Sequence, residues 1–460
     1  MSEPNWTNQT LWTGDNIDVM RGMNSESVDL IYLDPPFNSN RDYAAPIGSA
    51  AAGAAFKDTW TLDDLDVAWH GEVAEREPAL ASVIESAGLS HGKPMKAYLV
   101  MMSVRLLEMK RILKPNGTIY LHCDRTAGHY LKFTMDAIFR NENFRNEIVW
   151  RRHNAKGLAT RNMPTNHDLL LRYALGSGHA YNAQFRPHDQ AYIDRNYREI
   201  EEGTGRRYAL DNLVNPNKNR PNLTYEFLGV NRVWRWTRER MEQALADGRV
   251  VQKAPGRVPR YKRYLDEQPG IAVDSIWDDI SPVQARSRER TGYPTQKPLA
   301  LLERIISTSS QEGDVVLDPF CGCATACVAA EKLQRKWIGI DISDKAAELV
   351  RVRLQNELGL FYSGVHRTDV PQRTDLGDLP AYGSPSNRQL LYGSQEGRCN
   401  GCLTWFPFRN MTIDHVVARS RGGSDHIDNL QLLCGACNST KGTGTQEELI
   451  TRLRSQGIRD

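Results

Sequence analysis

The stretch Val28-Asp29-Leu30-Ile31-Tyr32-Leu33-Asp34-Pro35-Pro36-Phe37 decides the fold of this chain. Its first six residues form a short apolar run, which is typical of a parallel strand buried on both faces. An acidic residue, two prolines and an aromatic residue follow directly. Because open α/β sheets bind ligands at the carboxyl ends of their strands, this edge predicts a binding site.

The residues after the strand also indicate the ligand. The prolines fix the backbone so that carbonyls face the crevice without competing N–H groups, and Asp34 adds a carboxylate acceptor. Phe37 offers a flat face for stacking. Such a site suits a planar base that carries an exocyclic amino group. The alternative is an ordinary Pro-rich turn, and the rest of the chain decides between the two.

Length and composition are those of a soluble globular protein. The 460 residues allow two or three domains, and 25% charged and 40% hydrophobic residues are ordinary values. No apolar run approaches the ~20 residues that a membrane span needs, and residues 1–10 are polar. We therefore expect a cytoplasmic protein with no membrane partner.

The net charge of +2 is unevenly distributed, because residues 151–290 carry 25 Lys and Arg against 17 Asp and Glu. A basic segment suits contact with nucleic acid, and a solvated Arg-rich surface is the alternative. Within it, basic and aromatic side chains alternate, which favours phosphate contact and base stacking over tryptophans packed in a core. The alternating residues are Arg232, Trp234, Arg235, Trp236, Arg238 and Arg240.

The pattern along the chain predicts five regions. Two α/β halves, 1–150 and 291–365, flank the basic region 151–290, and a linker at 366–390 leads to a small module at 391–460. The periodicity predicts helices over 95–112 and 299–310. Strands are expected over 28–33, 315–317 and 337–340, and over 118–122 after a turn at 114–117.

A second informative turn, Asp318-Pro319-Phe320-Cys321-Gly322-Cys323-Ala324-Thr325, joins the strand over 315–317 to the next helix. Small residues there let a ligand approach the backbone at a helix N-terminus. Asp341 ends the following strand, where an acidic residue commonly binds ribose hydroxyls. Together they predict a nucleotide-like cofactor.

The motifs Asp34-Pro-Pro-Phe, Tyr293-Pro-Thr-Gln-Lys-Pro and Asp318-Pro-Phe-x-Gly together resemble the S-adenosylmethionine-dependent DNA amino-methyltransferases, over roughly residues 11–355. The order of the motifs, with a long basic segment between them, resembles the β class. The resemblance implies a Rossmann-like doubly wound sheet with an inserted target-recognition region, and double-stranded DNA as the partner.

The same resemblance assigns roles to residues. Asp34 and Pro35 would accept hydrogen bonds from the target amino group, with Pro36 completing the motif and Phe37 stacking on the flipped base. An acidic first residue in this motif leans toward adenine-N6, and cytosine-N4 stays open. The implied cofactor-binding residues are Asp15, Thr295, Lys297, Asp318, Phe320, Gly322 and Asp341. The chain departs from the usual pattern at Tyr293, where the family usually has His, and at Cys321, Cys323 and Ala324, where Gly or Ser is usual.

Two C-x-x-C pairs mark the C-terminal module, and their four thiolates can hold one structural Zn²⁺. These cysteines are Cys399, Cys402, Cys434 and Cys437. The segments Ile413-Asp414-His415, Arg421-Gly-Gly and Asp428-Asn429-Leu430, with Asn438 and Lys441-Gly442, resemble the HNH nucleases, a ββα-metal fold, over roughly residues 395–445.

By this second resemblance His415 would be the general base and Asn429 would orient it, while Asp414 and Asn438 would hold one Mg²⁺ or similar cation. The sequence thus predicts a DNA methyltransferase fused to an HNH endonuclease, acting in restriction–modification or phage defence. The alternative is a methyltransferase whose zinc module only binds DNA. Formation of a homodimer and a need for additional restriction subunits stay open.

Overall fold

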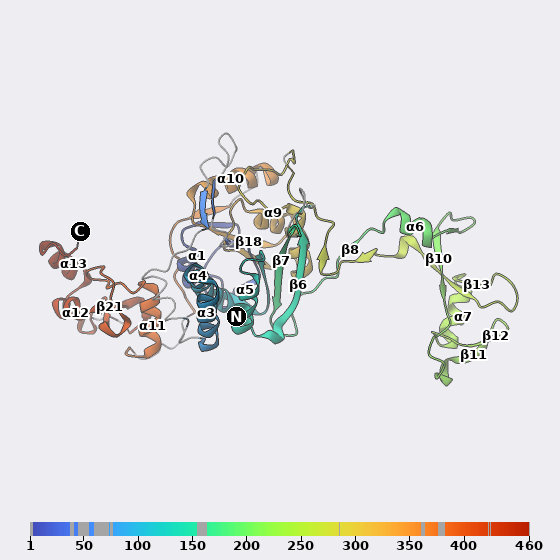
Figure 1. Ribbon diagram of the computed structural model, residues 1–460, viewed down its shortest axis with the longest axis horizontal. Coiled ribbons are helices and arrows are strands. Elements are labelled where there is room, and N and C mark those ends of the chain that lie inside the picture. Colours follow the sequence, from blue (N-terminus) through green and yellow to red (C-terminus); the bar gives the residue numbers. More distant parts are fainter. Residues whose placement is uncertain are drawn as a thin grey trace. The chain divides into compact units, whose positions relative to one another are not determined.

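A computed structural model gives the fold of the protein (Figure 1). It describes residues 3–36, 41–44, 55–58, 73, 77–153, 163–284, 286–359, 364–375, 382–421, 423 and 425–459. Phe37 therefore lies outside the described residues. Among the described helices, none combines the length and the hydropathy that crossing a bilayer requires.

The centre of the protein is a mixed sheet, for which the described residues supply nine strands in the order β16-β6-β7-β5-β2-β17-β18-β1-β19. Strand β7 runs antiparallel to both of its neighbours, and the other neighbouring pairs are parallel. The predicted Rossmann-like sheet is thus confirmed. The strands are β1 (Thr10–Thr13), β2 (Val28–Leu33), β5 (Leu113–Cys123), β6 (Phe144–Arg151), β7 (His167–Ala174), β16 (Ile276–Trp277), β17 (Val315–Asp318), β18 (Lys336–Asp341) and β19 (Val365–Arg367).

Strand β2 lies in the middle of this sheet, between β5 and β17. Its apolar side chains are buried, which explains the continuous apolar run in the sequence. Asp29 is the polar exception. Its carboxylate accepts hydrogen bonds from Lys114 Nζ at 2.8 Å and from the Val315 amide at 2.9 Å. The one acidic side chain of β2 therefore binds both neighbouring strands.

The helices gather in two groups, as expected for a sheet covered on both faces. Helix α4 contacts α1, α3 and α5, whereas α8 packs against α9. Most side chains of α4 are buried around its whole circumference, so it is a core helix. The helices are α1 (Asn16–Gly22), α3 (Pro78–His91), α4 (Lys93–Ile112), α5 (Gly128–Phe139), α8 (Leu299–Ser309), α9 (Thr325–Lys332) and α10 (Asp344–Leu358).

One predicted turn is wrong. Residues 114–117 belong to strand β5, which begins at Leu113. The register between β2 and β5 shifts between Val28 and Leu30, and a bulge of this kind tolerates Pro115 within a strand. A Cβ at Gly117 would lie 2.6 Å from the Leu113 side chain and 3.0 Å from the Asp29 carbonyl oxygen, so the irregular strand favours glycine there.

Residues Ala183–Asp274 form a compact unit of their own. It is shorter than the basic region set apart in the sequence, because β7 and β16 belong to the central sheet. The elements of this unit are β8 (Phe185–Arg186), α6 (Gln190–Asn196), β9 (Glu199–Ile200), β10 (Arg207–Asn212), β11 (Thr224–Phe227), β12 (Val230–Val233), α7 (Arg238–Ala246), β13 (Val250–Val251), β14 (Arg260–Tyr264) and β15 (Ile271–Ala272).

The structure corrects one expectation for this unit. Trp234 is fully buried among apolar side chains that include Phe227 and Met241, and its Nε1 donates to the Tyr225 carbonyl at 2.8 Å. It is a core residue and offers no stacking face. Trp236 is half-buried, with the Arg240 guanidinium 4.3 Å from its ring centre. The alternating pattern therefore contains both core and surface residues.

The C-terminal module has the predicted ββα arrangement, since β20 pairs antiparallel with β21 and α12 follows directly. Its core includes Leu391 and Tyr392 from a helix that begins inside the expected linker. The linker is also shorter at its start, because Thr374 is hydrogen-bonded to Asn24. The elements are α11 (Pro385–Ser394), β20 (Met411–His415), β21 (Leu430–Cys434), α12 (Gly435–Lys441) and α13 (Gln446–Ser455). A separate hairpin consists of β3 (Arg41–Ala44) and β4 (Ala55–Asp58).

Candidate active site

A cavity of about 420 Å³ lies at the carboxyl ends of β2, β17 and β18. The structure brings together here the predicted methyltransferase site residues that it describes, from five separate segments of the chain. Those that line the cavity are Asp15, Asp34, Pro35, Pro36, Thr295, Lys297, Asp318, Phe320, Gly322 and Asp341. Their shared position follows from the parallel strands, whose carboxyl ends meet at one edge.

The two carboxylate oxygens of Asp34 differ in their hydrogen-bond partners. Its Oδ2 forms an ion pair with Lys297 Nζ, a residue 263 positions away in the sequence. Its Oδ1 is buried and has no hydrogen-bond partner among the described residues. A buried acceptor without a donor is unfavourable by about 1–3 kcal/mol, so the cavity presents an acceptor that a ligand can satisfy.

Asp341 holds the turn over residues 318–325, which we call the cofactor turn. Its Oδ2 accepts a hydrogen bond from the Gly322 amide at 2.8 Å, and its Oδ1 accepts one from the Ser343 amide at 2.9 Å. Burial nevertheless raises the pKa of Asp341 to about 6. Burial also raises the pKa of Asp318 well above its usual value, and the carboxylates of Asp34 and Asp341 add to this effect. The cavity therefore concentrates negative charge away from water.

Tyr293, at the position where the sequence departs from the expected His, packs over the cofactor turn. A Cβ placed on Gly322 would lie 2.9 Å from Tyr293 Cε1, and Gly322 has a φ of +51°. Both the close approach and the backbone conformation therefore require glycine. Cys321 and Cys323 are buried beside this turn, so the small thiol side chains are accommodated without blocking it.

Arg105 is a residue of the site that sequence reasoning missed. It projects from α4 and donates from Nη2 to Asp15 Oδ1 and from Nε to Asn16 Oδ1, both at 2.7 Å. Asp15 in turn caps helix α1 by accepting from the Ile17 amide. The available signal was a charged residue within the stretch Leu99–Leu107 of this helix, which is otherwise uncharged. Its buried guanidinium fixes the loop that carries Asp15.

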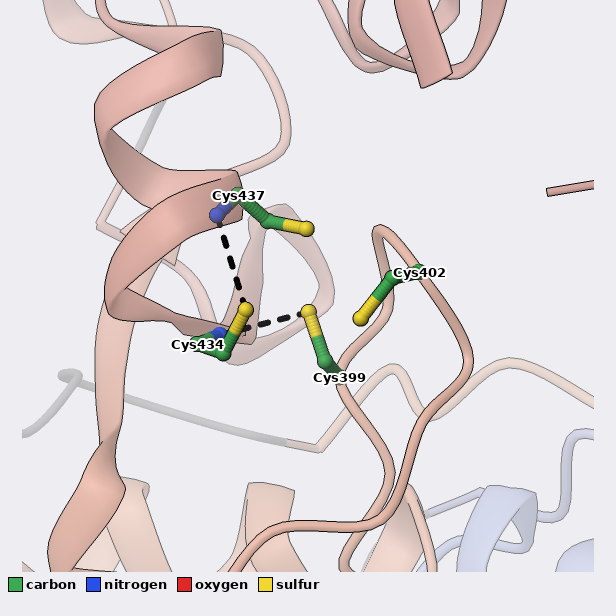
Figure 2. A group of neighbouring side chains, drawn as sticks. All are labelled: Cys399, Cys402, Cys434 and Cys437. Carbon is green, nitrogen blue, oxygen red and sulfur yellow. Dashed lines mark hydrogen bonds between the residues drawn. The ribbon is translucent and has the colours of Figure 1, made fainter. Parts of the chain in front are cut away.

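The four cysteines of the C-terminal module form one cluster, with their sulfur atoms all within 4.8 Å of one another. Figure 2 shows that Cys399 and Cys402 come from one loop, while Cys434 and Cys437 lie at the start of α12. The Cys434 amide donates to Cys399 Sγ at 3.2 Å. Tetrahedral Zn²⁺ with Zn–S bonds of ~2.3 Å places sulfurs about 3.8 Å apart, so the cluster suits zinc.

His415 ends strand β20 and is held by Asp425, an acidic residue that no motif in the sequence marks. Its Nε2 lies 2.8 Å from Asp425 Oδ1, and Tyr382 stacks on its ring with centroids 4.4 Å apart. The Arg419 guanidinium, together with His415, lowers the pKa of Asp425 to about 2. The described side-chain bonds of Asn429 join it to the Val417 backbone, which shapes the loop after His415.

The two predicted cation ligands lie on β20 and α12, which contact each other. Asp414 Oδ2 is 2.9 Å from the fully buried Lys441 Nζ and accepts from Gln431 Nε2 at 3.1 Å. Asn438 donates from Nδ2 to Thr412 Oγ1 at 3.1 Å. The Asn438 amide nitrogen is thus engaged, which leaves its carbonyl oxygen as the end suited to a cation.

Comparison with known families agrees with this division of the chain. Residues 28–351 match the DNA methylase family, and residues 399–444 match the HNH endonuclease family. The protein belongs to the DNA methylase family and carries a C-terminal HNH domain.

Similar proteins include restriction–modification enzymes. The chain is 29% identical over 351 residues to the Type II methyltransferase M.EcaI of Enterobacter cloacae, covering 75% of this chain and 69% of that protein. It is 27% identical over 346 residues to the Mod subunit of the Type III restriction-modification enzyme StyLTI of Salmonella typhimurium, covering 70% of this chain and 50% of the subunit. It also aligns with the crystal structure of a proposed DNA modification methylase from Thermus thermophilus, at 17% identity and a TM-score of 0.37, over 77% of this chain and 97% of that one.

Proposed function

We propose that this chain methylates N6 of adenine in double-stranded DNA with S-adenosylmethionine as donor, and that its HNH domain cuts DNA in a restriction–modification or phage-defence system. The observation that carries the methyltransferase half is the pair of acceptors at Asp34. One oxygen is buried without a partner among the described residues, in a cavity at the sheet edge where ligands bind.

The charges of the cavity support S-adenosylmethionine as the cofactor. This molecule carries a sulfonium, an ammonium and a carboxylate group, and is a cation overall. Burial raises the pKa values of Asp318 and Asp341, because their negatively charged forms lose hydration inside the protein. A cationic ligand compensates that charge. The cavity volume of about 420 Å³ lies in the range of ~300–1,000 Å³ that is usual for ligand sites.

The chain's own residues account for the chemistry of transfer. S-Adenosylmethionine supplies an electrophilic methyl group when bound. The lone pair of an aromatic amine is delocalised into the ring, so the amine is a weak nucleophile. By accepting hydrogen bonds from the two N–H groups, Asp34 and the Pro35 carbonyl direct this lone pair out of the ring, and the proton that the amine loses on methylation would pass to Asp34 or to water. Positioning and electrostatic stabilisation then supply the rate, and the base must leave the helix to reach them.

The HNH half of the proposal rests on His415. Its contact with Asp425 fixes the orientation of the imidazole ring, as a general base requires. Asp414 and Asn438 would hold a divalent cation on the scissile phosphate. A non-catalytic DNA-binding role is the second candidate, because Asp414 is already engaged by Lys441 and Gln431.

One experiment tests both halves. Purified protein is incubated with unmethylated and pre-methylated phage DNA and Mg²⁺, with and without S-adenosylmethionine, and nucleosides are identified by mass spectrometry. We expect N6-methyladenine, lost in Asp34→Ala, and cleavage of unmethylated DNA, lost in His415→Ala. N4-Methylcytosine would overturn the choice of base. If the protein transfers methyl groups but cuts no DNA, the HNH domain has the DNA-binding role instead. If it cuts only methylated DNA, methylation marks DNA for cleavage and does not protect it.

A further inference from the structure

Lys297 occupies one of the two acceptor oxygens of Asp34. Its ammonium group pairs with Asp34 Oδ2 and lies 3.4 Å from the Thr295 carbonyl. The side chains of Lys297 and Asp34 are only 10% and 17% exposed. With Lys297 in this position, one of the two Asp34 oxygens is withdrawn from any incoming amino group.

Hydrogen bonds hold Gln296 and Leu299 on either side of Lys297, which leaves the Lys297 side chain as the part best able to move. Gln296 accepts a hydrogen bond from the Thr291 amide at 2.9 Å and donates one to the Glu289 carbonyl at 2.7 Å. The Glu289 carboxylate accepts from the Leu299 amide at 2.9 Å, at the start of α8. The flexible four-carbon stem of Lys297 can therefore redirect its charge while the loop keeps its shape.

The other charges of the cavity give Lys297 a second partner. The described residues that line the cavity include two basic side chains, Arg105 and Lys297. Arg105 is committed to Asp15 and Asn16 by two hydrogen bonds of 2.7 Å. A ligand carboxylate that enters this acidic cavity is thus attracted to Lys297. S-Adenosylmethionine carries such a carboxylate on its amino-acid portion.

We propose that Lys297 couples cofactor binding to capture of the target base, by pairing with Asp34 in the free enzyme and with the cofactor's carboxylate in the complex. This inference rests on the proposed methyltransferase function. The exchange releases Asp34 Oδ2, so both carboxylate oxygens face the target amino group only after the cofactor has bound. Lys297 is a positioning residue, since it acts on the base through Asp34.

The coupling is reciprocal, because binding free energies are linked. If cofactor tightens the binding of the flipped base, then the base tightens the binding of cofactor by the same factor, typically about 5- to 150-fold. Both the carboxylate of the ligand and the ammonium group of Lys297 are needed. A ligand that lacks the carboxylate leaves Lys297 on Asp34.

The test first establishes the substrate. Methylated sites in DNA from cells that express the protein are located by sequencing, and a duplex with that site is confirmed as a substrate of the purified full-length chain. Absence of methyl transfer would overturn the proposed function. Methyl transfer shows that the function holds, so any later failure concerns the role of Lys297 alone.

The same duplex, with 2-aminopurine next to the intact target adenine, then reports base flipping, because the fluorescence of 2-aminopurine rises when its neighbour leaves the stack. S-Adenosylhomocysteine and its decarboxylated analogue are compared as ligands in the wild-type protein. We expect S-adenosylhomocysteine to tighten capture of the flipped base by at least about 5-fold and the decarboxylated analogue to have no such effect. Equal effects of the two ligands would overturn the inference, and this comparison requires no variant.

Variants at Lys297 add a second criterion. In Lys297→Gln the base should be captured without any ligand, and the difference between the two ligands should vanish. Lys297→Arg, which keeps the charge, should restore the difference. Lys96→Gln removes the lysine of an ion pair with Glu85 outside the cavity and serves as the matched control, which should behave as wild type. A Lys297→Gln protein that keeps the wild-type difference between ligands would overturn the inference.

Discussion

The cofactor cavity and the C-terminal HNH domain place their functional residues in opposite ways. In the cavity, Asp34 meets Lys297 across 263 positions of sequence, and the site exists only when the whole sheet is assembled. In the HNH domain, His415 meets Asp425 ten positions away, and two short Cys pairs hold the surrounding chain. The first site depends on a large apolar core, whereas the second depends on a local cluster suited to a metal ion.

This difference predicts that loss of metal affects one site and spares the other. Structural zinc contributes an apparent ~10–16 kcal/mol to small domains, so Cys434→Ser or a strong chelator should unfold the HNH domain. Methyl transfer should continue, because the cavity has its own core. Metal content, limited proteolysis and methylation assays on the full chain measure these effects. An HNH domain that resists proteolysis equally with and without chelator would contradict the role of the cysteines.

Within the HNH domain, the residues around His415 should differ in the size of their effects. Loss of a general base lowers the cleavage rate by about 10²–10⁴-fold, which is the expectation for His415→Ala. Asp425→Asn leaves the imidazole in place but removes the charged partner, and should lower the rate by about 10–100-fold. Glu447→Gln, an exposed acidic residue of α13, is the control. Equal rates for Asp425→Asn and wild type in a plasmid-nicking assay would exclude a positioning role for Asp425.

In the cavity, cofactor binding should depend on pH through Asp341. Burial raises the pKa of this carboxyl to about 6, so it is protonated below that pH and ionised above it. The ionised form favours a cationic ligand and accepts hydrogen bonds. Affinity for S-adenosylmethionine should therefore fall as the pH is lowered through 6. If bound cofactor lowers the pKa of Asp341 by one unit, the affinity for cofactor differs by about 10-fold between the ionised and the protonated protein. Calorimetry between about pH 5 and 8 measures how the affinity for S-adenosylmethionine changes with pH. Asp341→Asn should abolish this pH dependence. An unchanged pH dependence in that variant would assign the titration to another group.

The smallest effect concerns the contact between Gly322 and Tyr293. Gly322→Ala and Gly313→Ala both place a Cβ on a residue with positive φ, a strain of about 1–2 kcal/mol. The Cβ at Gly322 also collides with Tyr293, while nothing lies within 4 Å of the one at Gly313. Gly322→Ala should therefore lose about 1–3 kcal/mol more in thermal unfolding. Tyr293→Leu in the same chain should recover part of this loss, and an equal loss at both glycines would exclude the steric explanation.

Much of the central fold could be predicted from the sequence, because its elements carry local signals. The apolar runs of β2, β17 and β18 and the periodicity of α4 and α8 give their bounds to within a few residues. Strand β1, Thr-Leu-Trp-Thr, lacks a continuous apolar run, and the sequence pattern does not predict it. Residues 114–117 have turn chemistry, yet pairing with β2 draws them into β5. Local preference fails where tertiary pairing supplies the hydrogen bonds.

The candidate site likewise contains features that the sequence predicts and features that only the tertiary structure shows. Motifs and family resemblance identified Asp34, Lys297 and Asp341 as residues of one cavity, but gave no sign that Lys297 pairs with Asp34. Arg105 and Asp425 were missed because a side chain's partner across the fold leaves no mark in its own sequence neighbourhood. The roles of the predicted site residues stay predictions that the variants above can test.

The compact unit Ala183–Asp274 is an insertion whose two ends are anchored in the main fold. Before it, the Asn182 side chain donates to the carbonyls of Ser307 and Ser310 on α8 and just beyond it, and after it the Ser275 carbonyl accepts from Val149 of β6. Domain insertions are tolerated where both ends of the inserted chain are held in this way. A segment joined in this way can be replaced or removed without disturbing the sheet that forms the cavity.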